Sequence, residues 1–332
     1  IFAVIEKEGR FADEIASEVI TNTINNFPWA KSMRWGSGSM KWVRPLHSIL
    51  CILSAEDGVK TVNIEVDGIT SSNMTSGHRF MSPAKFAVHS IEQYQKDLKK
   101  ASVILDAQER ADHILEDAKN LAFAQGLELV EDTSLLKEVA GLVEYPVVLM
   151  GEISKDFFDL PSEVLITSMK EHQKFFSVKN PKTNRIEKFI TVANRTTADN
   201  GKTIIAGNQK VLFARLSDAK FFWENDLRIA KSGMNEWSEK LEKVTFHNKL
   251  GSQSERIKRI SLMACVASKL SNADEELAKR AAILCKVDLS SEMVGEFAKL
   301  QGLMGCYYSA EAGLPNEIGQ ASKDHYSPLG PT

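Results

Sequence analysis

The sequence predicts an α+β fold made of two domains, a mixed α+β domain over residues 1–230 and an all-α domain over residues 231–332. Two patterns predict it. Strand-like alternation, as in Val62, Ile64 and Val66, is interspersed with helical patterns up to about residue 200. From about residue 207 onward the apolar residues recur almost entirely at helical spacing. A chain of 332 residues is long enough for two domains, and the boundary is expected near 230–233.

The predicted mixed domain begins with an amphipathic helix over 10–26. Its apolar side is expected to carry Phe11, Ile15, Val19 and Ile20. Strands are expected over 42–54 and 60–69, and Gly58 and Gly68 bound the second of them. Helices follow over 90–102 and 106–125, and Gly126 is a suitable stop for the latter.

The rest of the first domain alternates between helices and strands. A helix over 133–140 leads into a strand over 145–150, where Pro146 indicates a strand start or an edge. Pro161 lies in the first turn of a helix over 161–171. Strands over 173–179 and 186–194 are joined by a hairpin with a basic tip. A long helix over 207–227 is expected to close the domain.

Charge is distributed unevenly along the chain, although the net charge is only −3. Residues 31–55 contain four Lys/Arg and no acid, and residues 56–163 contain ten Lys/Arg against twenty Asp/Glu. Residues 164–223 contain eleven Lys/Arg against four Asp/Glu, whereas the remainder is nearly balanced. If folding brings the two basic segments together, they would form a surface for a polyanion. The alternative is that the basic loops are simply solvated.

The four cysteines form no C-x-x-C pair, so buried free thiols are expected rather than zinc ligands or disulfides. This suits a reducing cytoplasm. No apolar run reaches the length of a membrane span, and no membrane partner is expected.

The run from Arg215 to Leu227 is the most distinctive stretch. It mixes cations, anions and the three consecutive rings Phe221, Phe222 and Trp223. Physical chemistry favours a buried helix with an apolar stripe of Phe213, Leu216, Phe221 and Trp223, flanked by i,i+3 and i,i+4 ion pairs.

As a string, this run resembles a signature of the bacterial glycyl-tRNA synthetase beta subunit, from the two-subunit type of that enzyme. Six further blocks occur in the order of that family: Met33-Arg34-Trp35-Gly36 with Val43-Arg44-Pro45-Leu46-His47, Ser76-Gly77-His78-Arg79-Phe80, Glu144-Tyr145-Pro146-Val147-Val148-Leu149, Ser168-Met169-Lys170-Glu171-His172-Gln173-Lys174-Phe175-Phe176, Glu292-Met293-Val294-Gly295-Glu296-Phe297 and Leu300-Gln301-Gly302-Leu303-Met304-Gly305. Compared with the family, the acidic N-terminal strand motif and the anticodon-binding region are missing.

The resemblance implies a subunit that positions tRNA-Gly and braces a catalytic partner. The chain contains no H-I-G-H, K-M-S-K-S or G-x-G-x-E-R motif, no Walker loop and no H-E-x-x-H site. Adenylate chemistry, with its ATP and Mg, is therefore expected in the alpha subunit of an alpha-two beta-two tetramer. No catalytic residue and no cofactor are expected in this chain, and no DNA partner.

Cations that lie beside aromatic residues or in the basic hairpin are the candidate tRNA contacts. These candidates are Arg34, Trp35, Lys41, Arg44, Arg79, Lys170, His172, Lys174, Lys182, Arg185, Lys210, Arg215 and Lys220. His172 alone is better explained by its place at a helix C-terminus. For Trp35, stacking on a base and packing under an Arg stem both remain open.

The C-terminal helical region resembles an HD-type domain, as the family does. His247 is a loose match to the first metal ligand of such a site. Lys286-Val287-Asp288 stands where the His-Asp pair is expected. Valine cannot bind a metal, so the site is interpreted as degenerate and metal-free. Asp288 is expected to pair with a neighbouring Lys or Arg. The competing hypotheses are a metal-dependent HD phosphohydrolase and a free-standing RNA-binding module.

Overall fold

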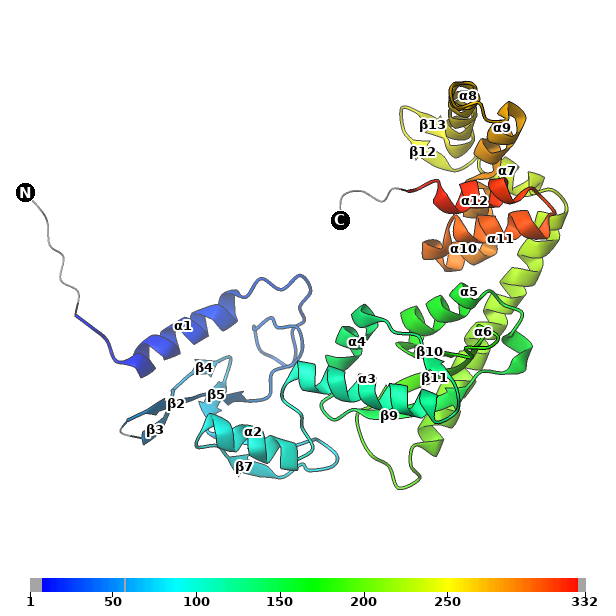
Figure 1. The fold of residues 1–332 in the computed structure, drawn as a ribbon. Coiled ribbons are helices and arrows are strands. Elements are labelled where there is room, and N and C mark those ends of the chain that lie inside the picture. The colour runs from blue at the N-terminus through cyan, green and yellow to red at the C-terminus, as the bar shows by residue number, and fades with distance from the viewer. Residues whose placement is uncertain (1–7, 57, 328–332) are drawn as a thin grey trace, which may run out of the picture. The chain divides into compact units, whose positions relative to one another are not determined.

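The computed structural model describes residues 8–56 and 58–327, and helices and strands both occur in it, which confirms the α+β class (Figure 1). The chain forms two compact units that interleave along the sequence. The first contains the residues up to Ile114 together with Lys137–Val147 and Ala193–Thr197. The second contains Leu115–Leu136, Val148–Val192 and the residues from Ala198 onward. The division near residue 230 stays a prediction of where a separate domain begins.

The first unit contains short strands together with helices α1 and α2 and parts of α3 and α4. A three-stranded sheet has the order β1 (Ile49–Leu50), β5 (Ile69–Ser72), β4 (Glu65–Val66). Two hairpins pair β2 (Ile52–Ala55) with β3 (Gly58–Thr61) and β6 (Met74–Ser76) with β7 (Lys85–Ala87). The predicted strands over 42–54 and 60–69 are therefore each broken into shorter pieces. The second helix is α2 (Ile91–Lys100), which Ser90 caps by accepting a hydrogen bond from the Gln93 N–H.

Helix α1 (Ala12–Asn26, labelled in Figure 1) lies within the predicted range 10–26. It turns a different face to the core than predicted. Ala16, Ile20 and Ile24 pack against the small core formed by Met40, Val62, Ile64 and Val66. Phe11, Ile15 and Val19 are 77%, 42% and 55% exposed. The predicted apolar side was wrong except for Ile20.

A four-stranded sheet lies at the centre of the second unit, in the order β8 (Glu128–Leu129), β10 (Phe176–Lys179), β11 (Ile186–Ala193), β9 (Val147–Glu152). Helices α3 (Ala107–Phe123) and α4 (Thr133–Ala140) flank β8 in the chain. Strands β10 and β11 are antiparallel and form the predicted hairpin. Helix α5 (Ser162–Ser168) continues into a single π-helical turn, Met169–Gln173, which ends where Lys174 adopts a left-handed conformation with φ of 56°.

Helix α6 (Lys202–Lys231) is longer than predicted and connects the sheet to the helical region (Figure 1). Near its start, the Asn208 side chain lies 3.3 Å from the Thr191 hydroxyl on β11. Its buried stripe comprises Leu212, Leu216, Ala219, Trp223, Asp226 and Ala230. Phe213 and Phe221 are 51% and 60% exposed, so their predicted place in the stripe was wrong. Lys220 and Glu224 form one of the expected i,i+4 pairs, with N and O 4.0 Å apart.

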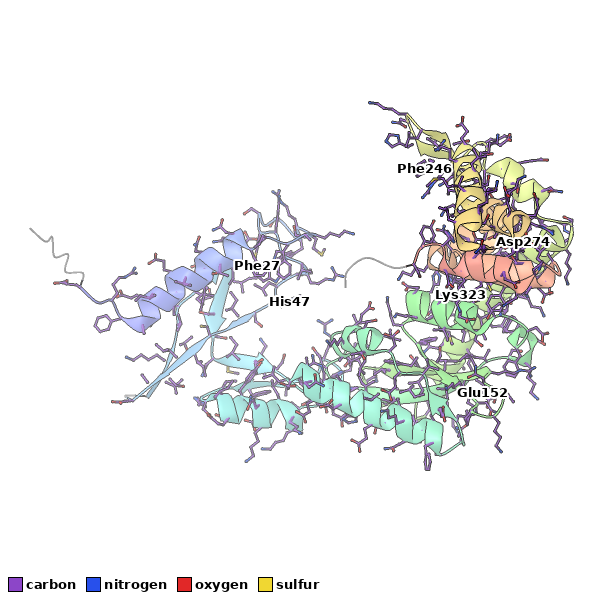
Figure 2. The ribbon with its side chains drawn as sticks, turned by 45° about the horizontal axis from the view of Figure 1, so that its top comes forward. Phe27, His47, Glu152, Phe246, Asp274 and Lys323 are labelled. Atoms are coloured by element: carbon purple, nitrogen blue, oxygen red, sulfur yellow. The ribbon has the colours of Figure 1, made fainter. Side chains whose placement is uncertain are left out.

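The residues after α6 are mainly helical. The helices are α7 (Asn235–Lys240), α8 (Gln253–Ser271), α9 (Glu275–Leu284), α10 (Glu292–Glu296), α11 (Leu303–Glu311) and α12 (Asn316–Asp324). A short hairpin, β12 (Thr245–His247) with β13 (Gly251–Ser252), departs from the predicted all-α pattern. On it, Phe246, which is labelled in Figure 2, has its ring centre 4.2 Å from the Arg256 guanidinium carbon.

Asp226 joins α6 to the helical region from inside the core. Its Oδ1 accepts the Glu292 N–H at 3.0 Å, and its Oδ2 accepts the Met293 N–H at 3.0 Å. These donors lie at the start of α10, where a helix has N–H groups without partners of their own. The ring of Tyr308 stacks on Trp223 with centroids 5.6 Å apart. The distinctive run from Arg215 to Leu227 is thus part of a helix whose buried side packs against the helical region, which agrees with the interpretation as a buried structural helix.

Candidate nucleic-acid interface

The tip of the β10–β11 hairpin carries two of the predicted contacts in the second unit. Lys182 and Arg185 are both exposed there, and their backbone N–H groups are held by Asn180 and Thr183 within the turn. Lys210 is exposed on α6. Within residues 8–56 and 58–327, none of these three cations forms an ion pair, so each retains an uncompensated charge. Uncompensated exposed cations are the groups that phosphate oxygens would meet.

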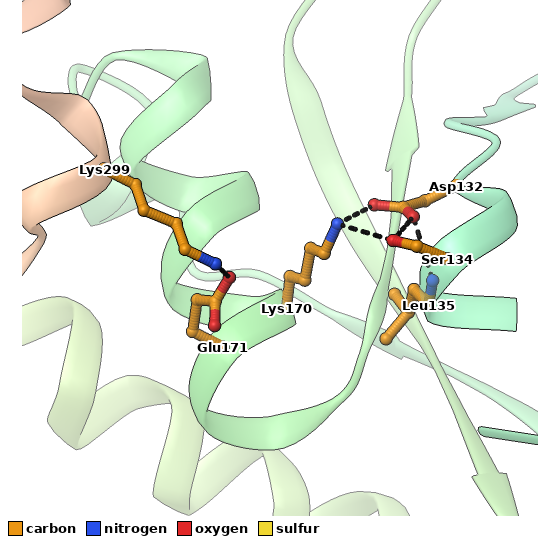
Figure 3. A network of polar contacts seen from close by, with 6 residues as sticks. All are labelled: Asp132, Ser134, Leu135, Lys170, Glu171 and Lys299. Atoms are coloured by element: carbon orange, nitrogen blue, oxygen red, sulfur yellow. Dashed lines mark hydrogen bonds and ion pairs between the residues drawn. The ribbon is translucent and has the colours of Figure 1, made fainter. Parts of the chain in front are cut away.

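Lys170 is used differently, because its amine is held inside a polar network (Figure 3). Its Nζ donates to the Asp132 carboxylate and, at 3.2 Å, to the Ser134 hydroxyl. Burial by itself raises the pKa of Asp132, but the hydrogen bonds from Lys170, from the Leu135 N–H and from Ser134 outweigh it and lower that pKa to about 2. Lys170 therefore ties the π-helical turn to the start of α4 and is not available to phosphate.

Glu171 and His172 face the helical region from the same turn. The Lys299 amine donates to Glu171 Oε1 at 2.6 Å, and this hydrogen bond lowers the pKa of Glu171 (Figure 3). His172 Nε2 lies 4.0 Å from Glu296 Oε1, and its ring meets Phe297 edge-on. The interpretation that His172 itself is not an RNA contact is consistent with these neighbours.

Arg215 and Lys220 on α6 also have partners. Arg215 Nη1 lies 3.9 Å from the same Glu296 oxygen. Lys220 Nζ donates to the Asp156 carbonyl at 2.9 Å in addition to its pairing with Glu224. Lys174 follows the π-helical turn and is half-buried. Of the predicted cations in the second unit, Lys182 and Arg185 at the hairpin tip and Lys210 on α6 are exposed and form no ion pair among the described residues.

The first basic segment belongs to the first unit, where its aromatic residues pack rather than point outward. Trp35 packs against the small core, which favours the packing explanation for this residue. Trp42 forms a backbone bridge with Met33 and contacts Phe27 and Trp29. Figure 2 labels Phe27 in this aromatic group and His47 nearby in the chain. The cations of the segment, Arg34, Lys41 and Arg44, are exposed, and Arg44 donates to the Val43 carbonyl.

The residues of the predicted HD-like site differ in their exposure. His247 is exposed on β12, and its Nδ1 accepts the Lys249 N–H at 3.1 Å. Asp288 is fully buried beside Val287. Over the described part of the chain, no three His, Cys, Asp or Glu side chains are grouped to hold a metal ion.

The expectation that Asp288 pairs with a Lys or Arg was wrong. Its Oδ2 instead accepts the backbone N–H groups of Gly302, at 2.5 Å, and Gly305, at 3.1 Å. These are the N–H groups at the start of α11, where the helix dipole favours a carboxylate. Burial nevertheless raises the pKa of Asp288 to about 6. The neighbouring Lys286 is buried, with its Nζ 4.0 Å from the centre of the Tyr326 ring.

The free thiols were predicted correctly, although only Cys285 is fully buried. Burial raises the pKa of the Cys285 thiol and of the Cys51 thiol. None of the helices in the described residues is both long enough and apolar enough to cross a membrane.

The described residues form an α+β protein that carries exposed cations at the tip of an antiparallel hairpin. The family described as glycyl-tRNA synthetase beta subunit matches residues 1–332, and the chain belongs to this family.

Several relatives carry the same description. The chain is 65% identical over its whole length to a glycine–tRNA ligase beta subunit of Ruegeria sp. (strain TM1040), and 62% identical to that of Dinoroseobacter shibae. It is 59% identical to that of Paracoccus denitrificans. The chain covers 48%, 46% and 48% of these three relatives, so it spans about half the length of the curated relatives that it matches.

Proposed function

We propose that this chain is the part of a glycine–tRNA ligase beta subunit that helps to hold tRNA-Gly, through the exposed cations of the β10–β11 hairpin and of α6. The observation that carries the proposal is the contrast among the basic residues. Lys170, Arg215 and Lys220 have acidic or carbonyl partners, whereas Lys182, Arg185 and Lys210 have no acidic partner among the described residues. Membership of a family described as glycyl-tRNA synthetase beta subunit supports tRNA as the polyanion.

The same proposal assigns the chemistry of aminoacylation to the partner. ATP, Mg and glycine would bind to the alpha subunit, which forms the glycyl-adenylate, and the terminal ribose hydroxyl of the tRNA attacks that adenylate. The beta subunit would contribute orientation in an alpha-two beta-two assembly in the cytoplasm. Orientation of reactants is worth up to roughly 7–11 kcal/mol of an activation barrier.

The test reverses the open cations in the full-length subunit assembled with its alpha partner. Lys182→Glu, Arg185→Glu and Lys210→Glu together should weaken tRNA binding and flatten its salt dependence. Removing one phosphate contact lowers the slope of log affinity against log salt by roughly 0.7–0.9. The measurement is tRNA affinity by fluorescence anisotropy at several salt concentrations.

A matched control reverses three other exposed cations, Lys279, Arg280 and Lys323, on α9 and α12 (Figure 2 labels Lys323). It produces the same change in net charge and should alter affinity much less. Equal effects of the two triple variants would show that only net charge matters, and the hairpin would then be ordinary solvated surface.

A second test addresses the division of labour. The isolated chain should show no glycine-dependent exchange between ATP and pyrophosphate, because its sequence contains no adenylate-forming motif. Exchange by a preparation free of alpha subunit would overturn this part of the proposal.

A further inference from the structure

Two blocks that are distant in the sequence meet at one cleft in the first unit. Residues 76–80 and residue Glu144 both line it, together with Asn194. One cavity of about 540 Å³ adjoins a second of about 380 Å³, and both share Arg79, Val103, Leu105 and Glu144. The combined space is within the size range of sites for small organic ligands, roughly 300–1,000 Å³.

His78 fixes the backbone turn that presents two side chains to this cleft. Its ring is 1% exposed, and its Nδ1 accepts the N–H groups of Phe80 and Met81 at 3.3 Å each. The N–H of His78 donates to the Ala101 carbonyl at 2.9 Å. Because the buried ring occupies the inside of the turn, the next two side chains, Arg79 and Phe80, are exposed.

Phe80 lines the cleft with an aromatic ring that is accessible to a ligand, unlike the ring of a buried core residue. Its side chain is 65% exposed although it lines the cleft. The guanidinium of Arg195 lies 5.2 Å from the centre of its ring, which fixes the ring by a cation–π contact. An exposed, oriented phenyl ring is the platform on which a nucleobase stacks.

The cleft is lined by both positively and negatively charged side chains. Arg79 is exposed and forms no ion pair within the described residues. Among the described residues, Arg110 donates to the carbonyl oxygens of Ile104, Leu105 and Ala140 and forms no ion pair with a carboxylate. Glu144 is exposed, and its backbone N–H is anchored by Asn194 Oδ1 at 2.7 Å.

We propose that this cleft binds a single unstacked nucleotide, with its base on Phe80 and its phosphate beside Arg79 and Arg110. Glu144 accepts a hydrogen bond from a base amino group or a ribose hydroxyl. A simple anion would leave Phe80 without a role, and an apolar ligand would leave both arginines without a counter-charge. The site lies in the first unit and goes beyond the proposed function, which rests on the second.

The nucleotide has two chemical sources, a single strand of RNA or a free mononucleotide. Binding to the 332-residue chain is measured with a fluorescein-labelled RNA tetramer, with the same tetramer carrying abasic riboses, and with AMP as competitor. The intact tetramer should bind more tightly than the abasic one. Tight competition by AMP would identify a free nucleotide as the ligand, and weak competition would identify a strand.

Phe80→Ala should weaken binding of the intact tetramer by roughly five- to hundredfold and leave the abasic tetramer nearly unaffected, because only the base stacks. Arg79→Gln should weaken both. Phe123→Ala, at a ring that is 83% exposed on α3, is the matched control and should change neither. Thermal unfolding of each variant shows that it is folded.

Equal binding of intact and abasic tetramers, or unchanged binding by both cleft variants, would overturn the proposal. Either result would leave the hairpin proposal untouched, since Lys182, Arg185 and Lys210 are intact in these proteins. Conversely, failure of the hairpin variants to affect tRNA would not alter the predicted response of Phe80→Ala.

Discussion

The hydroxyl of Tyr308 on α11 donates to Asp226 Oδ2 on α6 at 2.7 Å, inside a core where Asp226 is fully buried. Burial raises the pKa of Asp226, although its hydrogen bonds from Tyr308, Met293 and Glu292 act in the opposite direction. Burial and the nearby carboxylate also raise the pKa of Tyr308. Two helices and the start of a third thus meet at one carboxylate.

Removal of this hydrogen bond should destabilise the helical region. Tyr308→Phe keeps the stacking on Trp223 but leaves Asp226 without its side-chain donor, at an expected cost of roughly 1–3 kcal/mol. Asp226→Ala should cost more, because two backbone N–H groups then have no acceptor. Urea unfolding followed by tryptophan fluorescence measures both, and a Tyr308→Phe change below roughly 0.5 kcal/mol would contradict the argument.

Because of Asp288, the free energy of unfolding should be higher at mildly acidic pH than at neutral pH. Its folded pKa of about 6 lies above the ordinary value, so the stabilisation from its protonation is complete below about pH 4 and is lost as the pH rises through 6. Asp288→Asn keeps an acceptor for Gly302 and Gly305 but does not titrate. From pH 4 to pH 7 the variant should gain on the wild type by up to roughly 3 kcal/mol. A pH-independent difference in free energy of unfolding would be inconsistent with this assignment.

The pair of Lys170 and Asp132 should give stability a pH dependence opposite in direction to that of Asp288. Because the folded pKa of Asp132 is lowered to about 2, its contribution is present above about pH 4 and is lost as the pH falls towards 2. Lys170→Met should remove roughly 1–2 kcal/mol at pH 7 and make the stability less sensitive to acid in this range. The measurement is the urea midpoint at each pH. If Lys170→Met instead weakened tRNA binding without loss of stability, Lys170 would be an RNA contact after all.

Two glycines should respond to alanine in opposite directions. A Cβ at Gly77 would lie 2.4 Å from the Ala101 Cβ and 2.6 Å from the Ser82 carbonyl oxygen, so Gly77→Ala should destabilise by roughly 1–3 kcal/mol. Gly207, inside α6, has open space around the same position, and Gly207→Ala should stabilise by roughly 0.5–1 kcal/mol. Thermal unfolding decides both, and destabilisation by both would show that α6 needs Gly207 for another reason.

The helical region is expected to bind no transition metal. Purified chain incubated with manganese, iron or zinc should retain no stoichiometric metal after dialysis, since Val287 stands in the expected ligand position. Elemental analysis measures this. Bound metal that disappears in Asp288→Ala would mean that the site is functional.

The sequence predicted most elements because their periodicity and end signals agree. The helix over 133–140 and the β10–β11 hairpin are where the patterns placed them. The buried face of α1 could not be predicted, because apolar residues occur on both sides, Ile15 and Val19 on one and Ile20 and Ile24 on the other. Only the tertiary partner decides which side is covered.

The roles of charged residues were harder to predict. Nothing in the local sequence distinguishes Lys170, which is held by Asp132, from Lys182, which is open, because the partner lies 38 residues away. Asp226 has a charged side chain, yet it belongs to the buried stripe of α6, since its carboxylate oxygens accept N–H groups at the start of α10. The cleft was missed as a site because its walls come from four separate segments, residues 78–80, 103–110, 141–144 and Asn194. Arg79 and Glu144 each lie in a family motif, but nothing in the sequence placed those two motifs side by side.

Helix α6 contains 30 residues, which corresponds to a rod of roughly 45 Å. Its first turns are bonded to β11 and its last turns, through Asp226, to α10 and α11. The length of α6 therefore sets the distance between the sheet that carries the basic hairpin and the helical region. If the hairpin holds RNA as proposed, an RNA that also touches the helical region has to match this spacing, which favours a rigid, folded RNA over a flexible strand.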